Sequence, residues 1–174
     1  MAKAVFCVAT SQLQVESIVE QLKSAGFPND AASVLFPDKT GTHDFAHAPG
    51  TKAPEGAAAG VGTGGLLGGV LGWLAGVGML MVPGAGPFVG AGPVFAALGG
   101  AAVGGAVGGL AGMLIGLGIP EFEAKRYAGK LFDGNFLISV HTDDAQQRSS
   151  VKEIFRRARV QHITWAGESS AKGK

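Results

Sequence analysis

The sequence predicts an α+β protein, a split ferredoxin-like (βαβ-βαβ) sandwich with an inserted glycine-zipper α-helical hairpin. Both ends of the 174-residue chain show a strand–helix–strand pattern, a long uncharged segment separates them, and glycine recurs there at every fourth position. These features divide the chain into a first βαβ half at 1–38, a linker at 39–55, the hairpin at 56–120, a helix plus the second half at 121–167, and a disordered tail at 168–174.

The first half begins with the apolar run Ala4–Ala9, which is typical of a buried strand. Ser11 and Gln14 form a capping-box pattern for a helix, and Gly26 stands where such a helix ends. Ala32–Phe36 is the second strand. Two strands are too few for a stable sheet, so this half is expected to need the other one.

Residues 56–120 contain no Asp, Glu, Lys, Arg or His, and they hold 23 of the chain's 30 glycines. Prolines at 83, 87 and 93 divide the segment into two apolar halves, 56–82 and 94–119. Each half has about 26 residues, or ~39 Å as a helix, and a bilayer core needs about 20 apolar residues. The sequence therefore predicts two transmembrane helices that return the chain to one side of the membrane.

Glycine at every fourth position of a helix leaves a groove without side chains, in which a second helix can approach closely. We therefore expect the hairpin to pack on itself and on other copies in a homo-oligomer. The predicted helix-packing and oligomerisation residues are Gly56, Gly60, Gly64, Gly68, Gly72, Gly76, Gly100, Gly104, Gly108, Gly112 and Gly116.

Lysines and arginines flank the hairpin at both ends, whereas its tip at 83–93 has none. The positive-inside rule then favours a membrane protein with both termini in the cytoplasm. The alternative is a cytoplasmic, water-soluble homo-oligomer that buries the glycine-zipper hairpins in its core.

The second half begins with a helix at Glu121–Phe132, closed by Gly134, and a strand at Asn135–His141 whose alternation predicts that it is half-buried. Thr142 or Asp143 is expected to cap the next helix, which has an apolar face, and Gln161–Trp165 is the last strand.

Four cations on that next helix, Arg148, Lys152, Arg156 and Arg159, form a basic stripe. The stripe is a candidate contact for anionic lipid headgroups, and the alternative is an ordinary solvated helix face. Nucleic acid is not expected as a partner, because the net charge is only +1 and no aromatic residues interleave with the stripe.

No catalytic site is predicted. His43 and His47 have helical metal-ligand spacing but lie in the linker, and the His141–Asp144 cluster is explained as a helix N-terminus. Cys7 is expected to be a core residue. The sequence thus predicts a protein that is not an enzyme, without metal, cofactor or identified small-molecule substrate; a ligand sensor or enzyme built on the sheet is a further alternative.

The stretch GIPEFEAKRYAGKLFDGNFLISVHTDDAQQ at 118–147, preceded by the glycine-rich apolar centre, resembles a family of bacterial general-stress-protein-like proteins. The GIPEFEAKRY junction is its most distinctive part. The resemblance implies bacterial origin, hence the bacterial inner membrane for the predicted hairpin, a stress or envelope setting, and no established enzyme activity. It transfers no catalytic residues to this sequence. The leading hypothesis is a non-enzymatic, self-associating membrane protein, in which the hairpin anchors a small cytoplasmic α+β domain.

Overall fold

The computed structural model of the protein describes residues 3–37, 70, 73–74, 76–82, 86–96 and 107–167. In chain order its elements are β1 (Lys3–Ala9), α1 (Gln12–Ser24), β2 (Ala32–Pro37), β3 (Val77–Val82), β4 (Gly86–Ala91), α5 (Pro93–Ala96), α6 (Val107–Gly116), α7 (Glu121–Phe132), β5 (Phe136–Thr142), α8 (Ala145–Arg157) and β6 (Gln161–Gly167).

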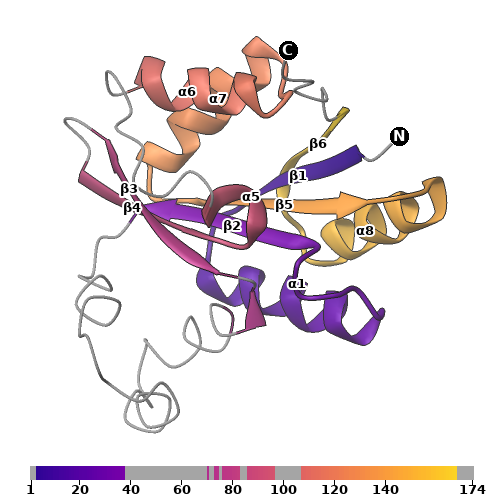
Figure 1. Cartoon of the computed structure of the whole chain (residues 1–174). Helices are drawn as coiled ribbons and strands as arrows, with labels where there is room; N and C mark the ends of the chain where they lie inside the picture. The colour runs from indigo at the N-terminus through magenta and orange to yellow at the C-terminus, as the bar shows by residue number, and fades with distance from the viewer. Residues whose placement is uncertain are drawn as a thin grey trace, which may run out of the picture.

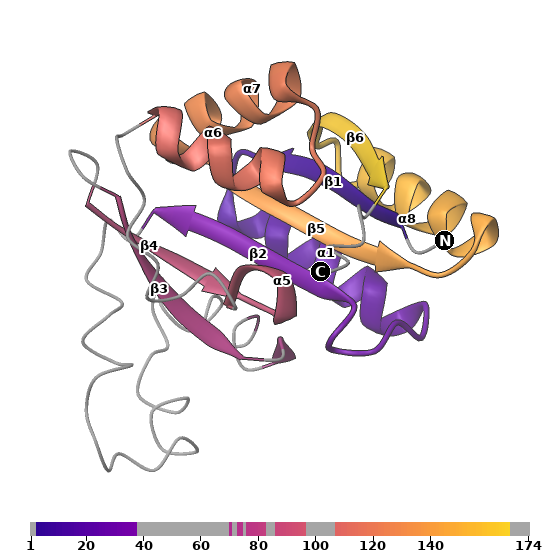
Figure 2. The same cartoon turned by 45° about the horizontal axis from the view of Figure 1, so that its top comes forward.

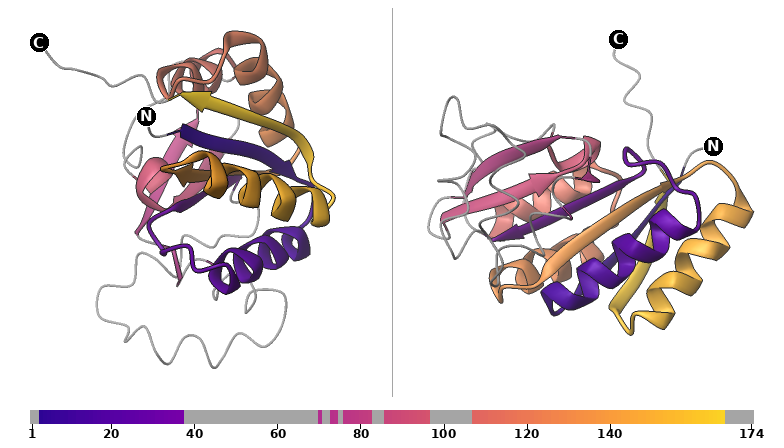
Figure 3. Two further views of the ribbon diagram at one scale, coloured as in Figure 1. Left: turned by 90° about the vertical axis from the view of Figure 1, so that its right-hand side faces the viewer. Right: turned by 90° about the horizontal axis from the view of Figure 1, so that it is seen from below.

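The strands form one antiparallel sheet in the order β3-β4-β2-β5-β1-β6. Helices cover both of its faces: α6 and α7 lie on one side, and α1 and α8 lie side by side on the other (Figures 1 and 3). The α+β class predicted from the sequence is confirmed. Each face of the sheet has its own hydrophobic cluster, so the molecule has two cores separated by the sheet.

The first unit forms as its sequence predicts. Ser11 is the N-cap of α1 and its hydroxyl accepts the backbone N–H of Gln14 at 3.3 Å. The side-chain amide oxygen of Gln14 accepts the N–H of Thr10 at 2.7 Å, one residue earlier than in an ideal capping box. The Gln14 amide also donates to the carbonyl oxygens of Ala158 and Arg159, so the start of α1 is joined to the chain just after α8.

β5 is a central strand, hydrogen-bonded to β1 on one side and β2 on the other (Figure 2). The expectation that this strand is half-buried is wrong, because all four residues from Leu137 to Val140 are buried. The reason is the second helical layer: a strand covered on both faces has no solvent side, whatever its alternation.

The prediction of one continuous helix over 56–82 is wrong for residues 77–82, which form strand β3. β3 and β4 are an antiparallel hairpin that extends the sheet beyond β2, with Val77 opposite Ala91 and Val82 opposite Gly86. Prolines at 83 and 87 disfavour helix here, and β-branched valines favour strand. Residues 86–91 of the expected tip therefore form a strand, β4, instead of a connection between two helices.

Two glycines outside the four-residue repeat are needed for this arrangement. A Cβ atom at Gly90 would lie 2.6 Å from the carbonyl oxygen of Phe95, and one at Gly92 would lie 2.6 Å from the Cα of Ser33. Gly92 also has a φ of +90°, a conformation that side chains disfavour. Part of the glycine enrichment therefore serves close backbone packing between β4, α5 and β2.

The second half of the predicted hairpin is helical at α6, but α6 packs on the sheet. Leu110, Ala111 and Leu114 are buried in the same cluster as Tyr127 and Leu131 of α7. Within the described ranges, no helix has the length and hydrophobicity that crossing a bilayer requires. α6, which lies within the predicted transmembrane span at 94–119, packs its apolar side against the protein's own sheet.

The four long helices end in the same way. In each, the third residue past the end donates its N–H to a carbonyl in the last turn, at 3.1 to 3.3 Å, while the residue before it has a positive φ. This is the Schellman arrangement, which usually places glycine at the positive-φ position. Gly26, Gly118 and Gly134 occupy it after α1, α6 and α7, whereas Arg159 occupies it after α8 with a φ of 55°.

Candidate functional site

The outward side of α6 has no side chains at the positions of the glycine repeat. Gly112 and Gly116 are exposed, and a Cβ atom added to either would meet nothing within 4 Å. Leu110 and Leu114, which point into the core, lie on the opposite side of the same helix. The four-residue spacing therefore places these glycines away from the sheet.

Exposed apolar side chains also occur on α6 and at the start of α7. Ile115 on α6 is 42% exposed, and Phe122 at the start of α7 is 70% exposed. The Arg126 guanidinium lies 4.7 Å from the centre of the Phe122 ring, an arrangement that favours one orientation of the ring. We call Gly112, Ile115 and Gly116 the glycine face; it is an uncharged surface on one side of the molecule.

The other predicted packing glycines are less informative. Gly108 lies in α6, one step earlier in the same row. Gly76 does not lie in a helix: it has a φ of +88°, and its carbonyl oxygen accepts the N–H of Gly92 at 2.8 Å beside the β3–β4 hairpin. The positions Gly56, Gly60, Gly64, Gly68, Gly72, Gly100 and Gly104 lie outside the described residues.

The basic stripe lies mostly on α8. Arg148 and Lys152 are half-buried, and Arg156 is exposed. Arg159 was predicted on the same helix, but α8 ends at Arg157, and Arg159 follows in a left-handed backbone conformation. The helix boundary could not be read from the stripe, because Arg159 keeps helical spacing although the helix has ended.

The cluster at 141–144 is largely structural, as predicted, although the capping residue is different. Asp144 is the N-cap of α8 and accepts the N–H of Gln147 at 2.7 Å. Thr142 is buried and donates its hydroxyl to the Lys3 carbonyl oxygen at 2.7 Å. Neither Thr142 nor Asp143 caps the helix, because each makes a different bond: the Asp143 N–H donates to the Gln147 side chain at 2.8 Å.

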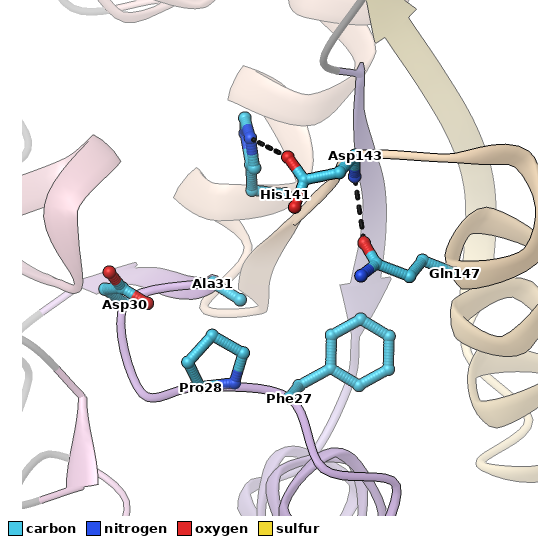
Figure 4. A pocket seen from close by; sticks show the side chains of 7 residues that line it. All are labelled: Phe27, Pro28, Asp30, Ala31, His141, Asp143 and Gln147. Atoms are coloured by element: carbon cyan, nitrogen blue, oxygen red, sulfur yellow. Dashed lines mark hydrogen bonds and ion pairs between the residues drawn. The ribbon is translucent and has the colours of Figure 1, made fainter.

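A shallow cavity of about 250 Å³ lies beside this turn (Figure 4). Its lining comes from the loop before β2, from the end of β5 and from the start of α8, namely Phe27, Pro28, Asp30, Ala31, His141, Asp143 and Gln147. His141 Nε2 lies 3.4 Å from Asp143 Oδ1, and the Asp143 side chain is mostly in solvent. The lining contains no serine, cysteine or lysine to act as a nucleophile. Sequence reasoning missed this cavity, because its walls come from three separate segments.

Among the described residues, two strongly perturbed titratable groups are buried. Burial raises the pKa of the Cys7 thiol well above its ordinary value, so Cys7 is the core residue that the sequence predicts. Burial also raises the pKa of Tyr127, whose hydroxyl donates to the His162 carbonyl oxygen at 2.9 Å. In the part of the chain that the structure covers, no three His, Cys, Asp or Glu residues are arranged to hold a metal ion.

One strained residue had no signal in the sequence. His162 has a φ of 52° where β6 bulges against β1, and its ring Nδ1 lies 3.4 Å from the Arg126 guanidinium. The bulge places the His162 carbonyl against Tyr127 of α7, so it joins the edge strand to the helical layer above it.

Comparisons with protein-family models, with curated proteins and with solved structures find no match to this chain.

Proposed function

We propose that this protein is a non-enzymatic, self-associating protein whose copies pack through the glycine faces of their α6 helices. The observation that carries the proposal is the exposed position of Gly112 and Gly116, with open space around both. Glycine inside a solvated helix costs about 1 kcal/mol relative to alanine. A monomer gains nothing from glycine at either position, whereas a helix crossing gains close backbone contact.

The rest of α6 is consistent with a contact between copies. The helix has no charged residue, so two glycine faces can meet without burying an unpaired charge. A crossing of two ten-residue helices covers less than the roughly 1,000 Å² that a stable interface needs. Ile115 on α6 and Phe122 at the start of α7 are exposed apolar side chains that a larger interface could include.

We also propose that the two flanking units form a split ferredoxin-like sandwich. The order β2-β5-β1-β6 places the first and third of their four strands in the centre and supports this assignment. The pairing of both β1 and β2 with β5 explains why the two halves need one another. On this proposal, β3, β4 and α6 are additions that enlarge the sheet and cover its second face.

The association can be tested on the full chain with Gly112→Leu and Gly116→Leu combined. Neither change meets an atom of the monomer at its Cβ, so the variant is expected to fold. Light scattering during gel filtration should show an oligomer for the original chain and a monomer for the variant. Gly129→Leu on α7 is the matched control, because it also has open space around it but lies outside the repeat; it should leave the oligomer intact.

A monomeric original chain at tens of micromolar would contradict the proposal, as would a double variant of unchanged size. Carbonate extraction of membranes from the native source distinguishes an oligomer without a membrane anchor from an oligomer that is anchored in the bilayer. Release into the supernatant favours the oligomer alone, whereas retention favours a bilayer anchor, and with it the inner-membrane location and stress or envelope role.

A further inference from the structure

The strongest local charge on the molecule lies on α8 and the strand that follows it. Residues 145–167 contain five cations, Arg148, Lys152, Arg156, Arg157 and Arg159, and one carboxylate, Glu153, which gives 5 − 1 = +4. The whole chain has a net charge of only +1. The charge on α1, which packs beside α8, is −1 from two glutamates and one lysine. The cations are therefore concentrated at one edge of the molecule.

Most of these cations have no carboxylate partner. Glu153 pairs with Arg157 at 3.1 Å, and this is the ion pair of α8 within the described ranges. Lys152, Arg156 and Arg159 have no carboxylate partner within those ranges. Arg159 also occupies the positive-φ position at which the other long helices have glycine, so the chain keeps a cation where the backbone favours glycine. An external anionic surface would complement this charge.

Two exposed apolar side chains lie on the same side of the sheet as α8. Trp165 on the edge strand β6 is 52% exposed and stands opposite Val5 of β1, so its side chain is on the face of the sheet that α8 covers. The Lys3 ammonium lies 4.7 Å from the centre of its ring. Leu13, which is 68% exposed, precedes Gln14, whose amide contacts the Arg159 carbonyl.

We propose that this surface, the basic face formed by Lys152, Arg156, Arg159 and Trp165, docks on a bilayer that contains anionic phospholipids. Lysine and arginine are attracted to the headgroups, and tryptophan is favoured at the interface between headgroups and hydrocarbon. A lipid surface fits better than nucleic acid, because a single-strand reader stacks successive bases on several aromatic side chains, and this face exposes only Trp165 within the described residues.

The test is flotation of the full chain with phosphatidylcholine vesicles, with and without about one-third phosphatidylglycerol. The original chain should bind the anionic vesicles only, and less as salt increases. The triple variant Lys152→Gln/Arg156→Gln/Arg159→Gln should bind about a hundredfold more weakly, at about fivefold for each cation. The charge-matched control Lys23→Gln/Lys125→Gln/Lys130→Gln removes three cations from α1 and α7 and should change binding less than threefold.

Trp165 supplies a second readout. In a Trp73→Phe background its fluorescence should shift to shorter wavelength with anionic vesicles, because the indole leaves water. Equal binding to both kinds of vesicle would overturn the proposal, and so would equal losses in the triple variant and its control. Binding to single-stranded DNA without binding to vesicles would instead assign the face to nucleic acid. A monomeric Gly112→Leu/Gly116→Leu variant keeps every residue of the basic face, so the result is separate from self-association.

Discussion

Arg159 shows how one backbone angle bears on both stability and function. Its φ of 55° is costly for a residue with a side chain, and the other three long helices have glycine at the same position. We expect Arg159→Gly to raise the free energy of unfolding by about 1 kcal/mol. Urea denaturation checks this through a higher midpoint with an unchanged slope. A lower midpoint would mean that the arginine side chain stabilises the fold more than its backbone strain destabilises it.

The same substitution removes one cation from the basic face. If that face docks on lipid, Arg159→Gly should be more stable and yet bind anionic vesicles about fivefold less tightly. A gain in one property with a loss in the other is the usual pattern where a strained residue is kept for function.

The buried Cys7 and Tyr127 predict a loss of stability at alkaline pH. Burial raises both pKa values above their ordinary 9.0 and 10.0, so each group ionises first in the unfolded chain. Stability from these groups is complete below about pH 9 and is lost as pH rises further. Tyr127→Phe should cost about 1 kcal/mol at pH 7, through the hydrogen bond to His162, and should flatten the decline above about pH 10.

Urea unfolding at a series of pH values from neutral to alkaline checks this prediction. An equally steep decline above pH 10 in Tyr127→Phe and the original chain would assign the alkaline effect to other groups.

At the scale of elements, a substitution in α6 tests whether this helix is part of the folded core. Leu114 is buried against the sheet, so Leu114→Ala should lower the free energy of unfolding by about 2–5 kcal/mol. The exposed Leu13→Ala on α1 is the control and should change it by less than about 0.5 kcal/mol. Thermal or urea unfolding of the purified chain measures both. A small effect at Leu114 would mean that α6 is not part of the folded core.

The ordinary elements were predictable because their signals are local. α7 spans the same residues, Glu121–Phe132, that the sequence indicated, and α1 begins after the predicted cap at Ser11. β3 was not predictable in this way. Its residues are apolar and include glycine, a composition that fits a lipid-embedded helix as well as a covered strand, and hydrophobicity alone does not separate the two.

At the scale of the whole molecule, the layer formed by α6 and α7 was the unpredictable part of the fold. A covering helix is normally recognised by polar residues on its outer side, but α6 has glycine there. The residues on the two sides of α6 differ in the size of their side chains and not in polarity. The sequence therefore showed the glycine spacing of Gly112 and Gly116 but not which side of α6 would meet the sheet.

The candidate surfaces were predictable to different degrees. Lys152 and Arg156 could be identified from helical spacing alone, because both lie on α8. Trp165 and Leu13 could not be assigned to the same side of the sheet, since that assignment depends on how β6 pairs with β1 and how α1 lies beside α8. Pairing between segments that are far apart in the sequence leaves no signal in the local pattern of residues.

The central position of β5 has a consequence for synthesis on the ribosome. β1 and β2 pair with β5 and not with one another, and β5 ends at Thr142, more than a hundred residues after β2 ends at Pro37. At about 5–20 residues per second, roughly 5–20 s pass before β5, the strand that joins β1 to β2, emerges. During that interval the apolar strands of the amino-terminal unit are open to chaperones, and the glycine-rich segment is made while the sheet that will receive it does not yet exist.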